Sequence, residues 1–213
     1  MPFVIAIDGR AASGKTTLAA EIAASLGQSP KTCFTRFFAP CACCSSTRFS
    51  GQARKSPVAK IGSAGLSEIA LSSSVVHMDD FFLPPEMRTT ERLDTPGGNI
   101  HHERFLKEIL PHIKEASTFF YNVFDCGVGD FNGVREAFGK IRIVEGAYSC
   151  HPIFGQYADL RIFCDVSPDE QITRIVARNG QKAAQVFQKK WIPMEEKYLE
   201  YYQIKRSADI VYC

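Results

Sequence analysis

Short apolar runs separated by amphipathic stretches predict that the chain alternates between strands and helices. Residues 3–8 (FVIAID) are apolar over too short a stretch for a helix and predict a buried strand. Similar runs predict strands at 75–78, 141–145, 160–165 and 208–212. Helical spacing predicts helices at 15–26, 103–114, 168–178 and 183–203. This alternation indicates an α/β protein with a parallel sheet and helices on both of its faces.

Other segments carry weaker signals. Ser167, Pro168 and Glu170 form an N-cap pattern, and Asn179-Gly180 predicts the end of the helix that they begin. Residues 83–99 are expected to form a long loop and 127–133 to form turns, while 118–124 is aromatic and β-prone. In residues 28–72 no period survives, and Ser, Cys, Arg, Gly and Pro dominate. We therefore expect a single domain over 1–213 with a loop-like or disordered insert at 28–72.

Composition narrows the class of protein. A length of 213 residues fits one domain, and 25 Lys+Arg against 23 Asp+Glu is too balanced for a dedicated nucleic-acid binder. No apolar run approaches a membrane span, and the N-terminal MPFVIAID lacks the basic start of a signal peptide. We expect a cytoplasmic protein whose 8 cysteines stay reduced, and their spacing does not match a zinc site.

Gly9 and Gly14 frame a phosphate-binding loop. The sequence Gly9-x-x-x-x-Gly14-Lys15-Thr16 matches G-x-x-x-x-G-K-[ST], between a predicted strand and a predicted helix. In such loops backbone N–H groups and a helix N-terminus bind phosphate, the lysine contacts the β- and γ-phosphates, and the hydroxyl ligates Mg²⁺. We therefore expect ATP and Mg²⁺ as cofactors. The expected nucleotide-binding residues are Gly9, Ala11, Ala12, Ser13, Gly14, Lys15, Thr16 and Thr17.

A pair of acids, Asp79 and Asp80, follows the predicted strand 75–78. In open α/β sheets the ligand binds just outside the carboxyl ends of the strands. A kinase needs a carboxylate there to orient the attacking hydroxyl and accept its proton. Neighbouring side chains on a strand end point to opposite sides, so we expect only one of the two, Asp79 or its rival Asp80, to face the γ-phosphate. The alternative interpretation is a solvated turn.

Several longer segments resemble the uridine kinase family, which is grouped with phosphoribulokinases and type I pantothenate kinases. They are GRAASGKTT, VVHMDDFFLPPEMR, ERLDTPGGN, VEGAYSCHP, YADLRIFCDVSPDEQITRIVARNG and WIPMEEKY, and the resemblance covers about residues 2–27 and 73–213. It implies a P-loop NTPase three-layer sandwich with a five-stranded parallel sheet in the order 2-3-1-4-5. The expected lid, around residues 178–190, is short, and in this the sequence departs from the better-known uridine–cytidine kinases.

The resemblance also implies roles for individual residues. Asp79 matches the catalytic aspartate, in a D-x-F pattern completed by Phe81, and acts with Lys15. Glu145 resembles the acid that helps Thr16 to hold Mg²⁺. The residues assigned to the substrate are Asp94, Phe82 and Arg174, and Arg178 is assigned to the nucleotide.

The acceptor stays open at this level. Phe124-Asp125-Cys126 stands where the family has Tyr-Asp-Phe, and the Tyr/His pair that reads the pyrimidine is not evident. The leading prediction is transfer of the ATP γ-phosphate to the 5′-hydroxyl of a nucleoside such as uridine or cytidine. The alternatives are a kinase of a pantothenate- or sugar-like alcohol, and a non-catalytic nucleotide-binding regulator. We expect a small-molecule substrate, no nucleic acid and no membrane, and a homo-oligomer is left open.

Overall fold

The computed structural model describes residues 1–26 and 72–213 and contains a five-stranded sheet in the order β2-β5-β1-β6-β7. All neighbouring strands in this sheet are parallel. The strands are Phe3–Gly9 (β1), Ser73–His77 (β2), Ile141–Glu145 (β5), Leu160–Cys164 (β6) and Ile210–Tyr212 (β7). Counted along the chain this is the order 2-3-1-4-5, so the predicted fold class is confirmed. The predicted insert lies outside the described residues except for Ser72, and the single-domain expectation stays a prediction.

Apolar side chains cover both faces of this sheet. On one face Leu18, Ala19 and Ile22 of α1 (Lys15–Leu26) pack against Ile5 and Ile7 of β1. On the other face alternate strand residues contact the aromatic side chains Phe105, Tyr157 and Tyr198. Because both faces are buried, the strands read as continuous apolar runs, which is why the sequence pattern locates them.

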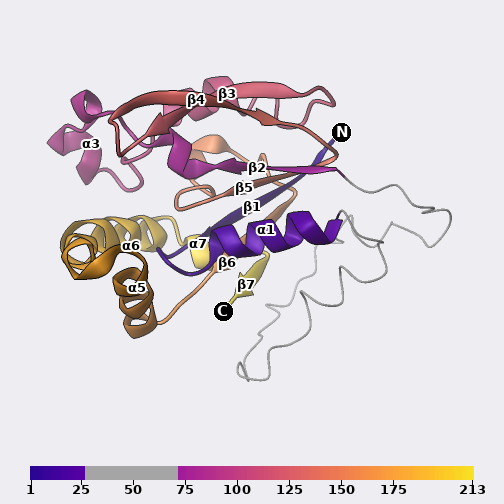
Figure 1. The fold of residues 1–213 in the computed structure, drawn as a ribbon. Helices are drawn as coiled ribbons and strands as arrows, with labels where there is room; N and C mark the ends of the chain where they lie inside the picture. Colours follow the sequence, from indigo (N-terminus) through magenta and orange to yellow (C-terminus); the bar gives the residue numbers. More distant parts are fainter. Residues whose placement is uncertain (27–71) are drawn as a thin grey trace.

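The carboxyl ends of three neighbouring strands meet at one edge of the sheet. In the β1–β5 register Ile7 is opposite Glu145, and in the β2–β5 register His77 is opposite the same residue. In Figure 1 these ends lie on the left, between α3 (Thr90–Asp94) above and α5 (Pro168–Val186) and α6 (Ile192–Tyr201) below. Segments that are far apart in the sequence therefore meet where the phosphate loop begins.

A two-stranded antiparallel hairpin, β3 (Phe119–Asp125) and β4 (Asp130–Ala137), lies beside β2 (Figure 1). The predicted turns at 127–133 are therefore wrong in part, because residue 130 already begins a strand. Most β4 side chains are exposed, so the segment has no apolar run. Pairing with β3 makes it a strand, and a local pattern does not contain that pairing.

Some predicted boundaries also differ. Helix α4 (His102–Glu108) ends before residue 114, and the loop 83–99 contains a 3₁₀ turn, Pro85–Met87, and α3. The predicted N-cap is confirmed, since Ser167 Oγ accepts a hydrogen bond from the Glu170 N–H. At Gly180 the backbone is non-helical (φ 82°, ψ 167°), as the predicted helix end suggested, but helical structure resumes after it.

The C-terminal helices continue beyond this kink. Helix α5 runs to Val186, and a π-helical turn, Phe187–Trp191, joins it to α6. The short helix α7 (Ile204–Ser207) follows α6 and leads into β7. Within residues 1–26 and 72–213 no helix is both long enough and apolar enough to cross a membrane.

Candidate functional site

The phosphate loop leaves β1 at Gly9, where only glycine fits. Gly9 has φ 139°, and a Cβ at this position would lie 2.0 Å from the Cys164 carbonyl oxygen. Two further loop residues, Ala12 (φ 58°) and Gly14 (φ 95°), are also left-handed. Alternation of handedness turns successive N–H groups toward one point, which makes a concave anion-binding nest.

Lys15 folds back over the loop that it follows. Its Nζ donates to the carbonyl oxygens of Gly9 (2.8 Å) and Arg10 (2.7 Å), and the side chain is buried. The first N–H groups of α1 have no partner within the helix, and Thr16 and Thr17 in its first turn are exposed. Ser13 is buried, and its hydroxyl has no hydrogen-bond partner in the described part of the chain. A helix N-terminus, a lysine and a nest are together groups that can bind a phosphorylated ligand.

Thr16 and Glu145, the two predicted metal ligands, lie next to each other. Thr16 Oγ1 donates to Glu145 Oε2 at 3.1 Å, and the other oxygen of Glu145 lies 2.5 Å from His77 Nδ1. A hydroxyl and a carboxylate suit Mg²⁺, which takes most of its ligands from water and from substrate phosphates. The described residues contain no cluster of three or more His, Cys, Asp or Glu side chains that could hold a metal. The Thr16 hydroxyl and the Glu145 carboxylate therefore fit a magnesium ion that also binds the phosphates of a nucleotide.

Asp79 and Asp80 have different environments, but not for the reason that the sequence suggested. They lie on a 3₁₀ turn, Met78–Phe81, and not on a strand end, because β2 stops at His77. Asp80 is buried, accepts a hydrogen bond from Tyr121 Oη (3.3 Å) and lies 3.5 Å from Arg135 Nε. Asp80 is therefore fixed within the protein by its own partners.

The Asp79 carboxylate is accessible and stands near the phosphate loop. Desolvation by surrounding protein raises its pKa, and the negative charge of Glu145 raises it further, while the Lys15 ammonium opposes both effects. A carboxylate with an elevated pKa and a solvent-accessible position is a typical general base.

A pocket of about 280 Å³ opens beside Asp79. The β3–β4 hairpin supplies most of its wall, and the 3₁₀ turn and Phe82 supply the rest. Its lining residues are Asp79, Asp80, Phe82, Val123, Phe124, Asp125, Cys126 and Arg135. The sequence does not single out Arg135, because β4 has no apolar run that would predict a strand there.

The remaining predicted site residues differ in whether they contact the phosphate loop. Arg174 Nη1 donates to the Ala12 carbonyl (3.3 Å), so α5 brings this side chain to the phosphate loop. Arg178 donates instead to Asn179 Oδ1 at 2.7 Å on the helix surface. Asp94 is exposed at the end of α3, and Lys197 Nζ of α6 donates to its Oδ1 at 2.6 Å.

Asp8 is a residue that the sequence pattern did not single out. Its buried carboxylate accepts hydrogen bonds from the N–H groups of Gly9, Tyr148 and Cys150 and from Tyr198 Oη (2.7 Å). Burial raises its pKa, and the hydrogen bonds oppose that shift. Asp8 thus ties the start of the phosphate loop to the segment after β5 and to α6. An acid at the end of an apolar strand is the only sequence signal for it.

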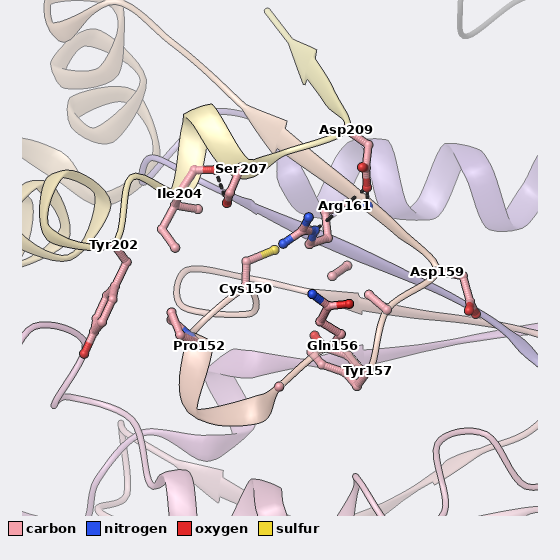
Figure 2. Close-up of a pocket in the computed structure, with 13 residues that line it drawn as sticks. Cys150, Pro152, Gln156, Tyr157, Asp159, Arg161, Tyr202, Ile204, Ser207 and Asp209 are labelled. Atoms are coloured by element: carbon pink, nitrogen blue, oxygen red, sulfur yellow. Dashed lines mark hydrogen bonds and ion pairs between the residues drawn. The ribbon is translucent and has the colours of Figure 1, made fainter. Parts of the chain in front are cut away.

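A larger pocket, of about 470 Å³, lies on the sheet face opposite α1 (Figure 2). Arg161 and Asp209 form a long ion pair of 3.9 Å at its rim, and Cys150 and Tyr157 lie on its inner side. No phosphate-loop residue lines it. This pocket is therefore separate from the candidate site.

Comparisons with known proteins agree with this fold. No protein-family model and no curated protein matches the sequence. One similar solved structure is a possible uridine kinase from Bacillus stearothermophilus, with 18% identity and a TM-score of 0.61 over the whole of this chain and 89% of that one. Another is a putative fructose transport system kinase from Silicibacter sp. TM1040, with 18% identity and a TM-score of 0.64 over the whole of this chain and 90% of that one. At this identity the likeness shows the fold alone, a five-stranded parallel sheet flanked by helices.

Proposed function

We propose that the protein is an ATP-dependent kinase that phosphorylates a hydroxyl group of a small molecule. The observation that carries the proposal is the position of Asp79, whose carboxylate lines a pocket and is close enough to Lys15 and Glu145 for their charges to shift its pKa. A phosphate loop alone is compatible with many nucleotide-binding proteins. A carboxylate between that loop and a pocket is what an alcohol kinase requires.

In this proposal each residue has a simple task. The nest and the start of α1 bind the phosphates of ATP, and Lys15 leaves the carbonyls of Gly9 and Arg10 to contact the transferred group. Thr16 and Glu145 would hold Mg²⁺, which would neutralise phosphate charge. Asp79 orients the acceptor hydroxyl and accepts its proton as the hydroxyl oxygen attacks the γ-phosphorus. The ADP oxygen leaves from the opposite side.

For the acceptor we propose the 5′-hydroxyl of a nucleoside such as uridine or cytidine. The rings of Phe82 and Phe124 line the pocket and suit the flat face of a base. Asp94, which the resemblance assigns to the substrate, is held by Lys197 and would have to exchange this partner for the hydroxyl groups of the ribose. We place the reaction in the cytoplasm, where ATP is available.

A second candidate, a sugar-like or carboxylate-bearing alcohol, has one observation in its favour. Arg135 lines the pocket and is 45% exposed, and within residues 1–26 and 72–213 its side chain has only a long 3.5 Å ion pair, with Asp80. A guanidinium with free donors suits an anionic acceptor such as a sugar phosphate or a pantothenate-like acid.

The test is a substrate panel with ATP and Mg²⁺, in which the product is identified by mass spectrometry. Nucleosides, sugars, sugar phosphates and pantothenate are compared for the wild type and for Asp79→Asn. The leading proposal is supported if the wild type phosphorylates a nucleoside and Asp79→Asn does not. A phosphorylated product from another alcohol supports the second candidate function. If the wild type binds ATP but phosphorylates none of these compounds, both kinase functions are rejected in favour of a non-catalytic nucleotide-binding regulator.

A further inference from the structure

The outer half of the phosphate loop is held by side chains from the C-terminal helices. Glu195 Oε2 of α6 accepts a hydrogen bond from the Ala11 N–H at 2.9 Å, and Gln171 Nε2 of α5 donates to the Ala11 carbonyl oxygen at 3.2 Å. Glu195 is 8% exposed and Gln171 is 1% exposed. Both polar groups of one loop residue are thus satisfied by buried side chains that lie 160 or more positions away in the sequence.

Packing from the same two helices supports these hydrogen bonds. Ile175 and Ala184 of α5 form a small buried cluster with Ala11. The side chain of Arg10, which precedes Ala11, pairs with Glu196 of α6 and with Asp165. The outer wall of the loop is therefore part of the α5–α6 layer and not a free surface turn.

The next residue shows why such support is needed. Ala12 has φ 58°, a left-handed conformation that is strained for a residue with a Cβ. Strained backbone persists only where the surrounding structure holds it. The Ala12 conformation in turn aims the following N–H groups toward the nest.

We propose that Glu195 and Gln171 are positioning residues for the phosphate loop. They hold the Ala11 peptide groups so that the loop has its phosphate-binding shape before a nucleotide arrives. This inference rests on the proposed function only in taking a nucleotide as the ligand. Neither residue contacts the pocket beside Asp79, so their role concerns phosphate binding and not the choice of acceptor.

A rival explanation makes the opposite prediction. A carboxylate bound to a loop N–H could occupy the loop in place of a phosphate and keep nucleotide out. Removing a positioning carboxylate should weaken nucleotide binding, whereas removing a competing carboxylate should strengthen it. The sign of the change in affinity therefore separates the two.

The experiment measures the affinity of ADP with Mg²⁺ by calorimetric titration of the full chain. In Glu195→Leu the Ala11 N–H loses its acceptor, and the dissociation constant should rise by roughly 10-fold, because the competent loop shape becomes less populated. In Glu195→Gln the amide oxygen can still accept, so affinity should stay within about 3-fold of the wild type. Glu200→Leu and Glu200→Gln, at an exposed position of the same helix, are the matched controls and should change affinity by less than about 2-fold.

Gln171→Met provides an independent variant that removes the second hydrogen bond from another helix, and it decides the question if Glu195→Leu does not fold. It should also weaken ADP binding by several-fold. Tighter binding by Glu195→Leu, or unchanged affinity in both loss variants, would overturn the inference. Wild type that binds ADP but phosphorylates no acceptor would refute the proposed function and leave this inference intact, whereas wild type that binds no ADP would overturn both.

Discussion

Replacing Glu195 by Gln should change how the stability of the protein depends on pH. Burial raises the pKa of Glu195 to about 7 from an ordinary value of 4.5, although Lys15 and the Ala11 N–H oppose the shift. In the unfolded chain the same carboxyl has its ordinary pKa. Between these two values the folded protein keeps a proton that the unfolded chain has lost.

The sign and size of the effect follow from this difference. The raised folded-state pKa stabilises the protein fully below the unfolded pKa, and this stabilisation is lost as the pH rises through the folded pKa. One pKa unit corresponds to about 1.4 kcal/mol, so the shift from 4.5 to about 7 is worth about 3.4 kcal/mol in all, of which about 2.5 kcal/mol is lost between about pH 5 and about pH 8. The Gln side chain in Glu195→Gln does not titrate. The free energy of unfolding of this variant should therefore rise by about 2.5 kcal/mol relative to that of the wild type as the pH increases over this range.

Urea unfolding followed by circular dichroism at several pH values measures both free energies. The relevant quantity is the difference between variant and wild type, because all other titrating groups cancel in it. Glu200→Gln, at an exposed position on the same helix, should leave the difference flat. Equal pH dependence in the wild type and Glu195→Gln would refute the reasoning and would mean that the carboxyl ionises as it does in water.

Four further predictions concern the phosphate loop and the two aspartates. Lys15→Ala should weaken ADP binding and lower turnover by on the order of 100-fold or more, because one charge contact to the transferred phosphate is lost; steady-state kinetics and titration measure both. Asp79→Asn should lower turnover by roughly 100- to 10,000-fold while ADP affinity stays nearly unchanged. Asp80→Asn should instead lower the free energy of unfolding by about 1–3 kcal/mol, because it weakens buried polar contacts. Gly9→Ala should destabilise the fold by more than about 2 kcal/mol in thermal unfolding, since its Cβ would lie 2.0 Å from a carbonyl oxygen of β6. Gly129→Ala is its control, with φ 80° but nothing within 4 Å of the added Cβ, and should cost only about 1 kcal/mol.

Each of these has an outcome that would contradict it. Near-normal turnover in Lys15→Ala would show that the loop is not the nucleotide site. Loss of turnover in Asp80→Asn together with normal turnover in Asp79→Asn would move the catalytic role to Asp80. Equal thermal stability of the two glycine variants would mean that the backbone at Gly9 relaxes without cost.

Local sequence was sufficient to predict the buried strands, the phosphate loop and the start of α5. The buried strands are apolar over their whole length, and the loop Gly9–Thr16 has a spacing that few other structures use. The start of α5 could be predicted for the same reason, since Ser167 caps a group only three residues away. In each case the residues that determine the structure are neighbours in the chain.

Tertiary structure decided what local patterns do not contain. Strand β4 is polar and exposed, so only its pairing with β3 makes it a strand, and with it Arg135 enters the pocket. The sequence predicts that two acids follow β2, but the 3₁₀ turn decides that Asp80 is enclosed and Asp79 is accessible. The support of Ala11 by Glu195 spans 184 positions, and the segment WIPMEEKY does not reveal which of its two acids turns inward. Contacts over such separations depend on how helices pack on the sheet, and for that reason only the folded chain specifies them.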